Sequence, residues 1–380
     1  MKKFFFLLMF IAFILYVCNR SVENNSIYEE KGVFISYIDY SILKGKNKNE
    51  MKHIISKMID NIDSFGLNSV ILQTNPFSDA IYYSKIYEPS HVVVDRGGDP
   101  LPLDILQYFI NVAKEKNIKV YAWMNPYRIR TSNIEINKNA YYYKWFNTDN
   151  IEVSNKGIFL NPASSEVLDY ISKGLRELCE NYEIEGIIYD DYYYPNETID
   201  LNTYKKSNSK KSLKQYRIDN INKLIETSYK TIKNVNKSIK FGLSPSGNIE
   251  YNLNTEYLDV KTIVSSDYID MIIPQLYYGF NNSNKPYMDT LNSWNNLNKK
   301  NKDLYVALSL YKAGKVDKYA GTGKNEWLKN TDIIRRQIIV SRNINNYKGF
   351  YIFRYEYLFD IYSDDSLNKE VNNLRSLIRK

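Results

Sequence analysis

Two adjacent carboxylates end an apolar run in this sequence. The segment Gly186-Ile187-Ile188-Tyr189 is followed directly by Asp190 and Asp191, then by three tyrosines at 192–194 and a proline. Such a run is typical of a short strand buried on both faces in a parallel sheet, and the end of that strand faces the ligand-binding edge. Paired carboxylates there could perform acid/base or nucleophilic chemistry. The alternative is that they cap the next helix or hold a loop.

Apolar, β-rich runs alternate with helical periods along the whole chain. We expect eight strands, at 33–38, 70–73, 119–124, 186–189, 241–245, 271–276, 305–310 and 350–354. The periodicity predicts helices at 51–62 (ending near Gly66), 103–116, 164–182 and about 213–235. Eight such units favour an α/β fold, a (β/α)8 TIM barrel with enlarged loops on its C-terminal face, over an open doubly wound sheet. The stretch Gly321-Thr322-Gly323-Lys324 lacks the spacing and the preceding strand of a nucleotide-binding loop.

In such a barrel the carboxyl ends of all strands meet at one mouth, where the functional groups lie. The residues expected there are polar or aromatic almost throughout, as a sugar-binding cleft requires, because such groups pair with hydroxyls and stack on pyranose faces. Turn formation, an Arg354–Glu356 ion pair and core packing of the aromatic rings are the alternatives for individual residues. The candidate substrate-binding residues are Asp39, Gln73, Asn75, Asp79, Tyr82, Trp123, Asn125, Tyr127, Arg128, Tyr192, Ser244, Gln275, Tyr277 and Arg354.

Five motifs at predicted strand ends carry a resemblance. They are, in order, Asn125-Pro126-Tyr127-Arg128, Leu160-Asn161-Pro162, Tyr189-Asp190-Asp191-Tyr192-Tyr193-Tyr194-Pro195, Gly242-Leu243-Ser244-Pro245 and Pro274-Gln275-Leu276-Tyr277. From about residue 31 to residue 358 the chain resembles the glycosyl hydrolase-like 10 family of bacterial surface proteins. The resemblance implies a (β/α)8 glycosidase that acts on cell-surface or peptidoglycan-type polysaccharide. Lys31 and Glu356 stand where the family usually has arginine and a small residue, and neither belongs to the aspartate pair.

Glycoside hydrolysis needs one protonated and one ionised carboxyl group. Neighbouring strand residues point to opposite faces, so Asp190 and Asp191 are expected to differ in role unless the strand already curls into its loop. By similarity to the fourth-strand nucleophile of several retaining barrel glycosidases, we assign Asp190 the role of nucleophile or charge stabiliser. Asp191 is then the acid/base or the group that tunes its neighbour, and repulsion should raise the pKa of one of the two. Other candidate acids at the mouth are Asp39, Asp79, Glu88 and Glu356, whereas Asp270 precedes its strand and is excluded.

The chain has 380 residues, with 51 basic and 43 acidic side chains and a formal net charge of +8. The lysines are scattered, so this excess is a general surface charge that favours an anionic partner such as a cell-wall polymer. No basic helix, zinc spacing or other motif indicates nucleic acid, and we expect no protein partner. His53 and His91 match no metal-binding spacing, so no metal and no cofactor are expected.

The N-terminus is expected to direct export. Lys2 and Lys3 precede an apolar run over 4–17, which is shorter than the roughly 20 residues of a spanning helix. Residues 1–18 therefore resemble a signal peptide, and Cys18 resembles the lipidation site of a bacterial lipoprotein, although no small residue precedes it. An uncleaved anchor is the alternative. We assign residues 19–31 to a flexible tether and 32–380 to the glycosidase-like domain, in a protein anchored at the cell surface or secreted.

The other cysteine, Cys179, lies on the apolar face of a predicted helix and is expected to be a buried free thiol. With Cys18 in the export signal, no disulfide can form inside the domain. The favoured function is an exported glycoside hydrolase that cleaves O-glycosidic bonds in a cell-wall or surface polysaccharide, with peptidoglycan-type glycan favoured. The alternative is a non-catalytic surface lipoprotein that binds polysaccharide. A second well-placed carboxylate beside Asp190 would separate the two.

Overall fold

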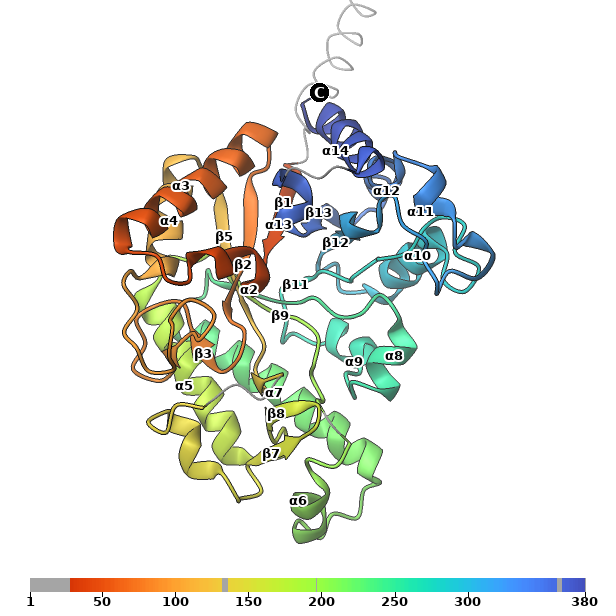
Figure 1. The fold of residues 1–380 in the computed structure, drawn as a ribbon. Coiled ribbons are helices and arrows are strands. Elements are labelled where there is room, and N and C mark those ends of the chain that lie inside the picture. Colours follow the sequence, from red (N-terminus) through yellow and green to blue (C-terminus); the bar gives the residue numbers. More distant parts are fainter. Residues whose placement is uncertain (1–27, 132–135, 196, 361–363, 380) are drawn as a thin grey trace, which may run out of the picture.

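The computed structural model of the protein describes residues 28–131, 136–195, 197–360 and 364–379 (Figure 1). Eight parallel strands close into a barrel, and around it they follow the order of the chain. They are β1 (Glu30–Ile35), β2 (Ser69–Asn75), β5 (Lys119–Met124), β9 (Gly186–Tyr189), β10 (Lys240–Leu243), β11 (Met271–Ile272), β12 (Asp303–Ser309) and β13 (Tyr347–Phe353). The predicted (β/α)8 barrel is thus confirmed.

Six of the eight strands differ from their predicted bounds, and for two of them the structure shows a local reason. The first strand ends at Ile35 instead of 38 because the Ser36 side chain caps α2 (Tyr37–Tyr40), with Asp39 completing a capping box. β1 also starts at Glu30, two residues before the domain start placed at 32. β11 is short because Pro274 has no N–H to donate, and beyond it only single bridges join Gln275 to Ser246 and Ala307.

Helices surround the barrel, with α3 and α4 on one side in Figure 1 and α10, α12 and α14 on the other. Ser164 caps α5, and α3 ends at Gly66, whose φ of 90° suits a glycine. The long helices are α3 (Lys48–Phe65), α4 (Ile105–Glu115), α5 (Ser165–Asn181), α7 (Leu213–Val235), α10 (Tyr287–Leu297), α12 (Ile333–Ser341) and α14 (Asp365–Ile378). Shorter ones are α6 (Leu201–Lys206), α8 (Ile249–Asn254), α9 (Val260–Val264), α11 (Glu326–Lys329) and α13 (Tyr355–Phe359).

Two loops on the carboxyl side of the barrel are enlarged into small sheets, as predicted. The loop after β2 contains the parallel pair β3 (Asp79–Ala80) and β4 (Glu88–Pro89). The loop after β5 forms the antiparallel sheet of β6 (Arg128–Arg130), β8 (Gly157–Leu160) and β7 (Ile151–Ser154). Both loops stand over the mouth, so they position side chains there.

The predicted N-terminal signal and Cys18 lie outside the described residues. Within the described ranges, no helix is long and apolar enough to span a bilayer. Cys179 is a buried free thiol, as expected, and burial raises its pKa to about 12.

The barrel interior is filled by ten apolar or aromatic side chains: Phe34, Ile71, Tyr121, Trp123, Ile188, Met271, Ile273, Tyr305, Ala307 and Tyr351. Because side chains alternate along a strand, the next inward position lies two residues further on, at the mouth. Those positions are Ser36, Gln73, Asn125, Asp190, Ser244, Gln275, Ser309 and Phe353. Seven of these eight residues are polar, so the apolar core ends in a polar layer that faces the mouth.

Candidate functional site

The polar layer at the mouth is held by side-chain amides. Gln73 Nε2 donates to Asn125 Oδ1 at 2.7 Å, which joins the ends of β2 and β5. Gln275 Nε2 donates to Asp190 Oδ1 at 2.6 Å and to the Ser244 carbonyl at 3.0 Å. Asp190 is therefore fixed in the layer by a neutral donor, and these predicted site residues are brought together.

The chain turns immediately after β9, and this brings the two aspartates together. Tyr192 has a φ of 64°, a left-handed conformation that only a tight turn requires. The Tyr193 hydroxyl fastens the turn by donating to the Tyr189 carbonyl at 3.0 Å. The carboxyl groups of Asp190 and Asp191 form a hydrogen bond with each other. The strand curls into its loop here, so the opposite-face rule does not separate the pair.

We call Asp190 and Asp191 the dyad. Asp190 is buried, and burial followed by the charge of Asp191 raises its pKa well above the usual range. Asp191 is partly exposed, and burial also raises its pKa, but the hydrogen bond from Asp190 and the charge of Arg128 oppose that rise. The sequence predicted that mutual repulsion would raise the pKa of one carboxyl, whereas both pKa values are raised and burial is the larger cause. The geometry favours a proton on Asp190 and a charge on Asp191.

Arg128 lies between the dyad and the aromatic rings of the mouth. Its Nε donates to the Pro76 carbonyl at 2.8 Å and its Nη2 to Asn125 Oδ1 at 3.2 Å. The guanidinium lies 4.6 Å from the ring centre of Phe77 and 5.2 Å from that of Tyr192. Of the three consecutive tyrosines only Tyr192 is exposed, at 45%.

Glu256, which precedes α9, is an acidic residue of the site that the sequence analysis missed. Its Oε2 accepts a hydrogen bond from the Tyr194 N–H at 3.2 Å, and its Oε1 accepts one from the Tyr251 hydroxyl at 3.2 Å. Burial and the charge of Asp191 raise its pKa to about 7. Glu256 follows no strand, so no strand-end pattern could indicate it.

Four predicted binding residues lie instead in the supporting structure of the loops. Asn75, Asp79, Tyr82 and Tyr127 are almost fully buried. Asn75 Nδ2 donates to the Asp79 carbonyl at 2.9 Å and contacts the Tyr82 hydroxyl at 3.1 Å. Their polar side-chain groups form hydrogen bonds inside the protein or are covered by it. These residues therefore support the loops that form the cleft.

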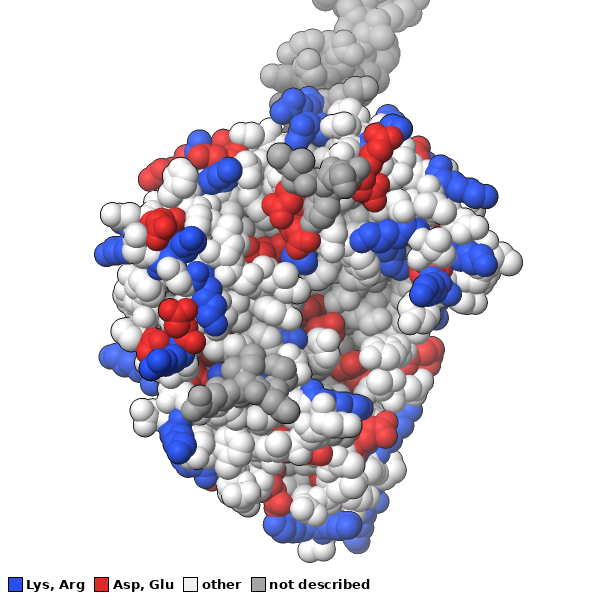
Figure 2. Space-filling model, viewed as in Figure 1, with Lys and Arg blue, Asp and Glu red and all other residues white. Residues whose placement is uncertain are grey.

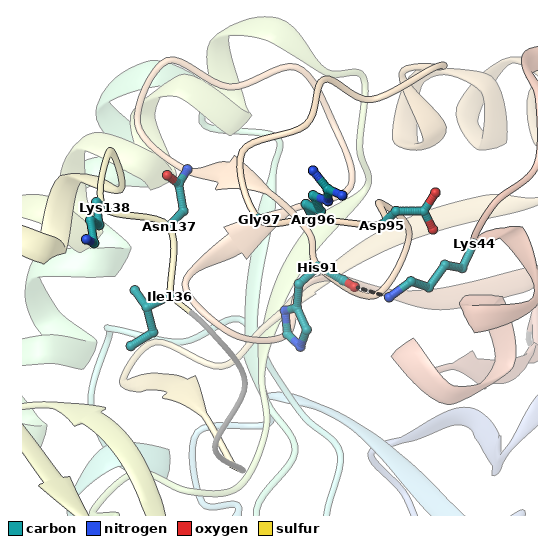
Figure 3. A pocket seen from close by; sticks show the side chains of 8 residues that line it. All are labelled: Lys44, His91, Asp95, Arg96, Gly97, Ile136, Asn137 and Lys138. Carbon is teal, nitrogen blue, oxygen red and sulfur yellow. Dashed lines mark hydrogen bonds between the residues drawn. The ribbon is translucent and has the colours of Figure 1, made fainter.

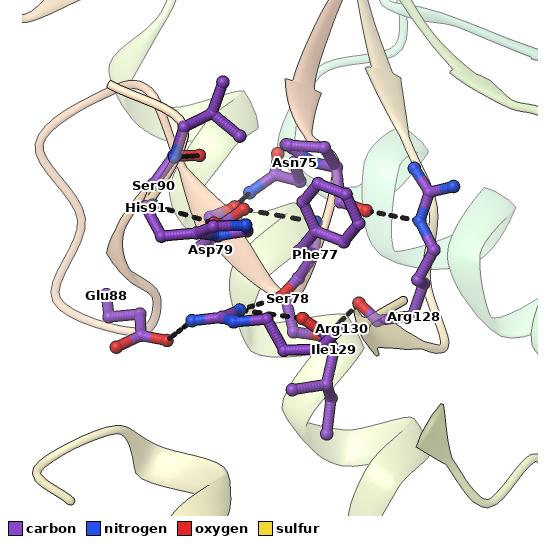
Figure 4. A network of polar contacts seen from close by, with 12 residues as sticks. Asn75, Phe77, Ser78, Asp79, Glu88, Ser90, His91, Arg128, Ile129 and Arg130 are labelled. Carbon is purple, nitrogen blue, oxygen red and sulfur yellow. Dashed lines mark hydrogen bonds and ion pairs between the residues drawn. The ribbon is translucent and has the colours of Figure 1, made fainter. Parts of the chain in front are cut away.

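Asp79 belongs to a buried network in the loop after β2 (Figure 4). His91 Nδ1 lies 2.9 Å from Asp79 Oδ2, and Arg130 Nη2 lies 2.9 Å from Glu88 Oε1. The Tyr142 hydroxyl donates to the same Glu88 oxygen at 2.5 Å. Burial alone would raise the pKa of Asp79, but His91 and Arg130 lower it below its usual value. Glu88 therefore pairs with Arg130, and Asp79 is held by His91 and stabilised by the nearby Arg130 charge.

The candidate acids near the first and last strands form a second paired group. Arg354 Nη1 lies 2.6 Å from Asp39 Oδ1, and Arg354 also pairs with Glu356, as the alternative interpretation predicted. The Ser36 hydroxyl and N–H both donate to Asp39 at 2.7 Å. Asp270 lies at the amino end of β11, where it pairs with Lys233 at 2.8 Å, which agrees with its exclusion from the mouth.

Aromatic side chains line the β11 to β13 side of the mouth. Tyr277 is half-buried, and its ring lies 5.8 Å from that of Phe353 and 6.1 Å from that of Tyr311. Trp123 packs inside the barrel 5.7 Å from Phe34, yet its Nε1 has no hydrogen-bond partner within the described part of the chain. Ser309 Oγ in the polar layer likewise lacks one. Buried donors of this kind are satisfied by water or by a polar ligand.

The face seen in Figure 2 is hollowed near its centre, and acidic and basic side chains are exposed within the hollow. Among the residues described, no group of three or more histidine, cysteine, aspartate or glutamate side chains could hold a metal ion. The side chains at the mouth thus offer proton transfer, charge and hydrogen bonding at the end of a barrel.

Comparison with known proteins gives relatives over most of the chain. A Bacillus subtilis (strain 168) protein named glycosyl hydrolase YngK is 28% identical over 339 residues, which cover 82% of this chain and 64% of that protein. The Escherichia coli (strain K12) glycosyl hydrolase DigH is 26% identical over 355 residues, covering 85% of this chain and 80% of DigH. The chain therefore spans less than two thirds of the length of the Bacillus relative.

Solved structures share the fold at low identity. The glycoside hydrolase domain of PgaB from Bordetella bronchiseptica matches with a TM-score of 0.57 at 12% identity, covering 92% of this chain and 99% of that domain. An endo-1,4-beta-mannanase from Rhizomucor miehei matches with a TM-score of 0.56 at 12% identity, covering 94% and 96%. Both matches support the barrel architecture.

The family comparison covers the strands that carry the dyad. The family model described as glycosyl hydrolase-like 10 matches residues 29–322, which contain all five resemblance motifs and both aspartates of the dyad. Phe353 and Arg354, at the last strand end, lie beyond the matched residues. Because the match extends over most of the chain, this protein belongs to the glycosyl hydrolase-like 10 family.

Proposed function

We propose that this protein hydrolyses O-glycosidic bonds in a cell-wall or surface polysaccharide, with a peptidoglycan-type glycan as the favoured substrate. The observation that carries the proposal is the hydrogen-bonded pair Asp190 and Asp191 in the polar layer at the barrel mouth. Family membership and two relatives named glycosyl hydrolases support the reaction class. The preference for a wall glycan rests on the expected export of the chain.

Within this proposal the dyad acts as one unit. Carboxyl groups joined by a hydrogen bond are closer than the about 5 Å of retaining or the about 6.5–9.5 Å of inverting glycosidases, so they cannot stand on opposite sides of one glycosidic bond. The second carboxyl function must come from elsewhere at the mouth. Glu256 is our candidate, because its raised pKa of about 7 keeps a proton available near neutral pH and the charge of Asp191 acts on it.

The roles inside the dyad also need revision relative to the sequence-based assignment. Asp190 is the deeper residue and receives a hydrogen bond from the neutral amide of Gln275, whereas Asp191 is partly exposed and feels the charge of Arg128. We infer that Asp190 keeps the proton and donates a hydrogen bond to Asp191, which stays ionised. The charge on Asp191 then stabilises the positively charged transition state or activates the group that attacks the sugar.

The aromatic and amide groups of the mouth support a sugar substrate. The Tyr192 ring is exposed and the Tyr277 ring is half-buried, and sugar faces stack on such rings. The unpartnered Trp123 Nε1 and Ser309 Oγ are donors that sugar hydroxyls could satisfy.

The test measures the release of reducing ends from purified wall polysaccharide by the full chain in detergent, beside the Asp191→Asn variant. Wild type should release sugar, and the variant should bind the polymer without cleaving it. A surface protein that only binds polysaccharide would give equal binding by both proteins and no release from a broad panel of glycans. That outcome would reject hydrolysis.

Export and lipid anchoring remain proposals. Labelled palmitate should enter the wild-type chain at Cys18 and not the Cys18→Ser variant, which should also leave the membrane fraction. Unchanged membrane association of the variant, with no label in wild type, would indicate an uncleaved anchor.

A further inference from the structure

A cavity of about 650 Å³ lies beside the mouth (Figure 3). Three loops that follow neighbouring strands line it. One residue comes from the loop after β1, four from the loop after β2 and three from the loop after β5. These residues are Lys44, His91, Asp95, Arg96, Gly97, Ile136, Asn137 and Lys138. Since all three loops leave carboxyl ends of the barrel strands, the cavity lies on the same side of the barrel as the dyad.

The cavity is lined with an excess of positive charge. Lys44, Arg96 and Lys138 are exposed, and none forms an ion pair with another residue that the structure describes. Lys44 Nζ contacts only the His91 carbonyl, at 3.4 Å. Asp95 is the acidic residue of the lining. Three unpaired cations gathered around one hollow are available to an anion.

His91 adds a fixed polar group to the wall of this cavity. Asp79, which is fully buried, accepts from the His91 N–H at 3.2 Å and lies 2.9 Å from the ring Nδ1. Figure 4 shows the ring held against Asp79, with Arg130 and Glu88 in the same network. The ring Nε2 has no partner among the described residues, and the ring remains partly exposed, at 12%. The buried carboxylate thus sets the orientation of a ring nitrogen that is free for a ligand.

A row of ring contacts joins the cavity to the dyad. The rings of His91 and Phe77 lie 4.9 Å apart, and the Arg128 guanidinium lies 4.6 Å from the Phe77 ring. Arg128 in turn acts on Asp191. Phe77 and Arg128 are buried, so this row of groups forms the floor between the cavity and the dyad, and one polymer can occupy both.

We propose that this cavity is a subsite for an anionic substituent, a carboxylate or a phosphate, on the glycan that occupies the mouth. The inference deepens the proposed function and rests on it for the identity of the polymer. Lys44, Arg96 and Lys138 supply the charge, and His91 supplies an oriented nitrogen. The substrate class is then an acidic polysaccharide rather than a neutral one.

The test compares binding of neutral dextran, carboxymethyl dextran and dextran phosphate of equal length by the full chain. The variant Lys44→Gln/Arg96→Gln/Lys138→Gln should bind the favoured acidic polymer about tenfold more weakly at low salt, because each lost charge contributes modestly. Binding of neutral dextran should not change. Whichever acidic polymer shows the larger loss identifies the anionic group.

A matched control removes three exposed lysines from the opposite end of the barrel, with Lys237→Gln, Lys299→Gln and Lys348→Gln combined. It has the same net charge as the cavity variant and should bind within twofold of wild type. Equal losses in both variants, or no loss in either, would overturn the proposal. A variant with Lys44→Arg and Lys138→Arg retains the charge and should bind as wild type does.

Vesicles that contain anionic lipid test whether the cavity binds lipid headgroups instead of an anionic group on a glycan. A larger loss for vesicles than for either acidic polymer would overturn the proposal in favour of a membrane contact. Because these measurements record binding without turnover, they separate the two proposals. Selective binding with no hydrolysis would reject the proposed function alone, and hydrolysis without selective binding would reject the subsite alone.

Discussion

The dyad and the Asp79 network are both buried acidic groups in the loops of the barrel mouth, yet their electrostatic surroundings are opposite. Asp79 has His91 and Arg130 beside it, and its pKa is lowered. Asp190 has another carboxyl and a neutral amide beside it, and its pKa is raised well above the usual range. A buried carboxylate in the field of Arg130 stabilises a loop, whereas a buried carboxyl whose partners are another carboxyl and an amide keeps a proton that chemistry can use.

The largest expected effect is on kcat, and it differs between the two members of the dyad. Asp191→Asn should lower kcat by about 10³-fold, because the charge near the substrate is lost. Asp190→Asn should lower it much less, about 10-fold, since an amide at 190 can still donate a hydrogen bond to Asp191. Initial rates of reducing-end release measure both. An equal or larger loss for Asp190→Asn would restore the attacking role to Asp190.

The second effect concerns the stability of the network. Asp79→Asn should lower the free energy of unfolding by about 3 kcal/mol, because it removes the buried carboxylate that accepts hydrogen bonds from His91 and from the Phe77 N–H. Urea unfolding followed by circular dichroism measures the change, and Asp289→Asn, at an exposed position in the first turn of α10, is the control. A loss no larger than that of the control would mean that Asp79 is not a structural anion.

The third prediction concerns the proton donor. Glu256→Gln should lower kcat/KM by about 10- to 100-fold and remove the fall in activity above a pH of about 7 that an acid with this pKa produces. The exposed Glu250→Gln variant is the control. A pH profile of Glu256→Gln that keeps the same upper limb would assign that limb to another group.

The smallest effect is a difference in pH dependence, and its sign is opposite for the two acidic groups. Asp79 has a lowered pKa, so its stabilising effect is present above the unfolded-state pKa of about 4 and is lost as the pH falls below it. Asp190 has a raised pKa, so its ionisation costs stability at high pH and the cost disappears as the pH falls through the folded-state pKa.

Lowering the pH should therefore shrink the stability advantage of wild type over Asp79→Asn, and it should also shrink the stability advantage of Asp190→Asn over wild type. Urea unfolding at a series of pH values measures both differences. The free energy of unfolding of wild type minus that of the variant should fall for Asp79→Asn and rise for Asp190→Asn as the pH is lowered. Changes in the same direction would show that the two groups do not differ in ionisation.

The barrel could be predicted from the sequence because its determinants are local. Each apolar run of the eight strands is visible in the chain, and α7 begins and ends at the predicted residues, 213 and 235. The parity of each strand also predicts which side chain faces the mouth. What failed was the end of the first strand, where Ser36 and Asp39 form a helix cap that competes with the apolar pattern through 38.

The site was only partly predictable because some of its contacts join loops. Strand ends indicated Gln73, Asn125, Asp190 and Gln275, and these do form the polar layer. Glu256 and the cavity around His91 depend on how long loops fold over the mouth. No spacing in the sequence records that arrangement, and the turn that brings the two aspartates together depends on the left-handed Tyr192.

A proton on the dyad at neutral pH is the feature on which the proposed chemistry depends most. Infrared difference spectroscopy between wild type and Asp190→Asn at pH 7 detects it, and subtraction removes the signals of Glu256 and Glu370, whose pKa values are also raised to about 7. We predict a carbonyl band of a protonated carboxylic acid in wild type that is absent from the variant. A spectrum in which wild type shows only carboxylate bands in its place would contradict the proposed role of the pair.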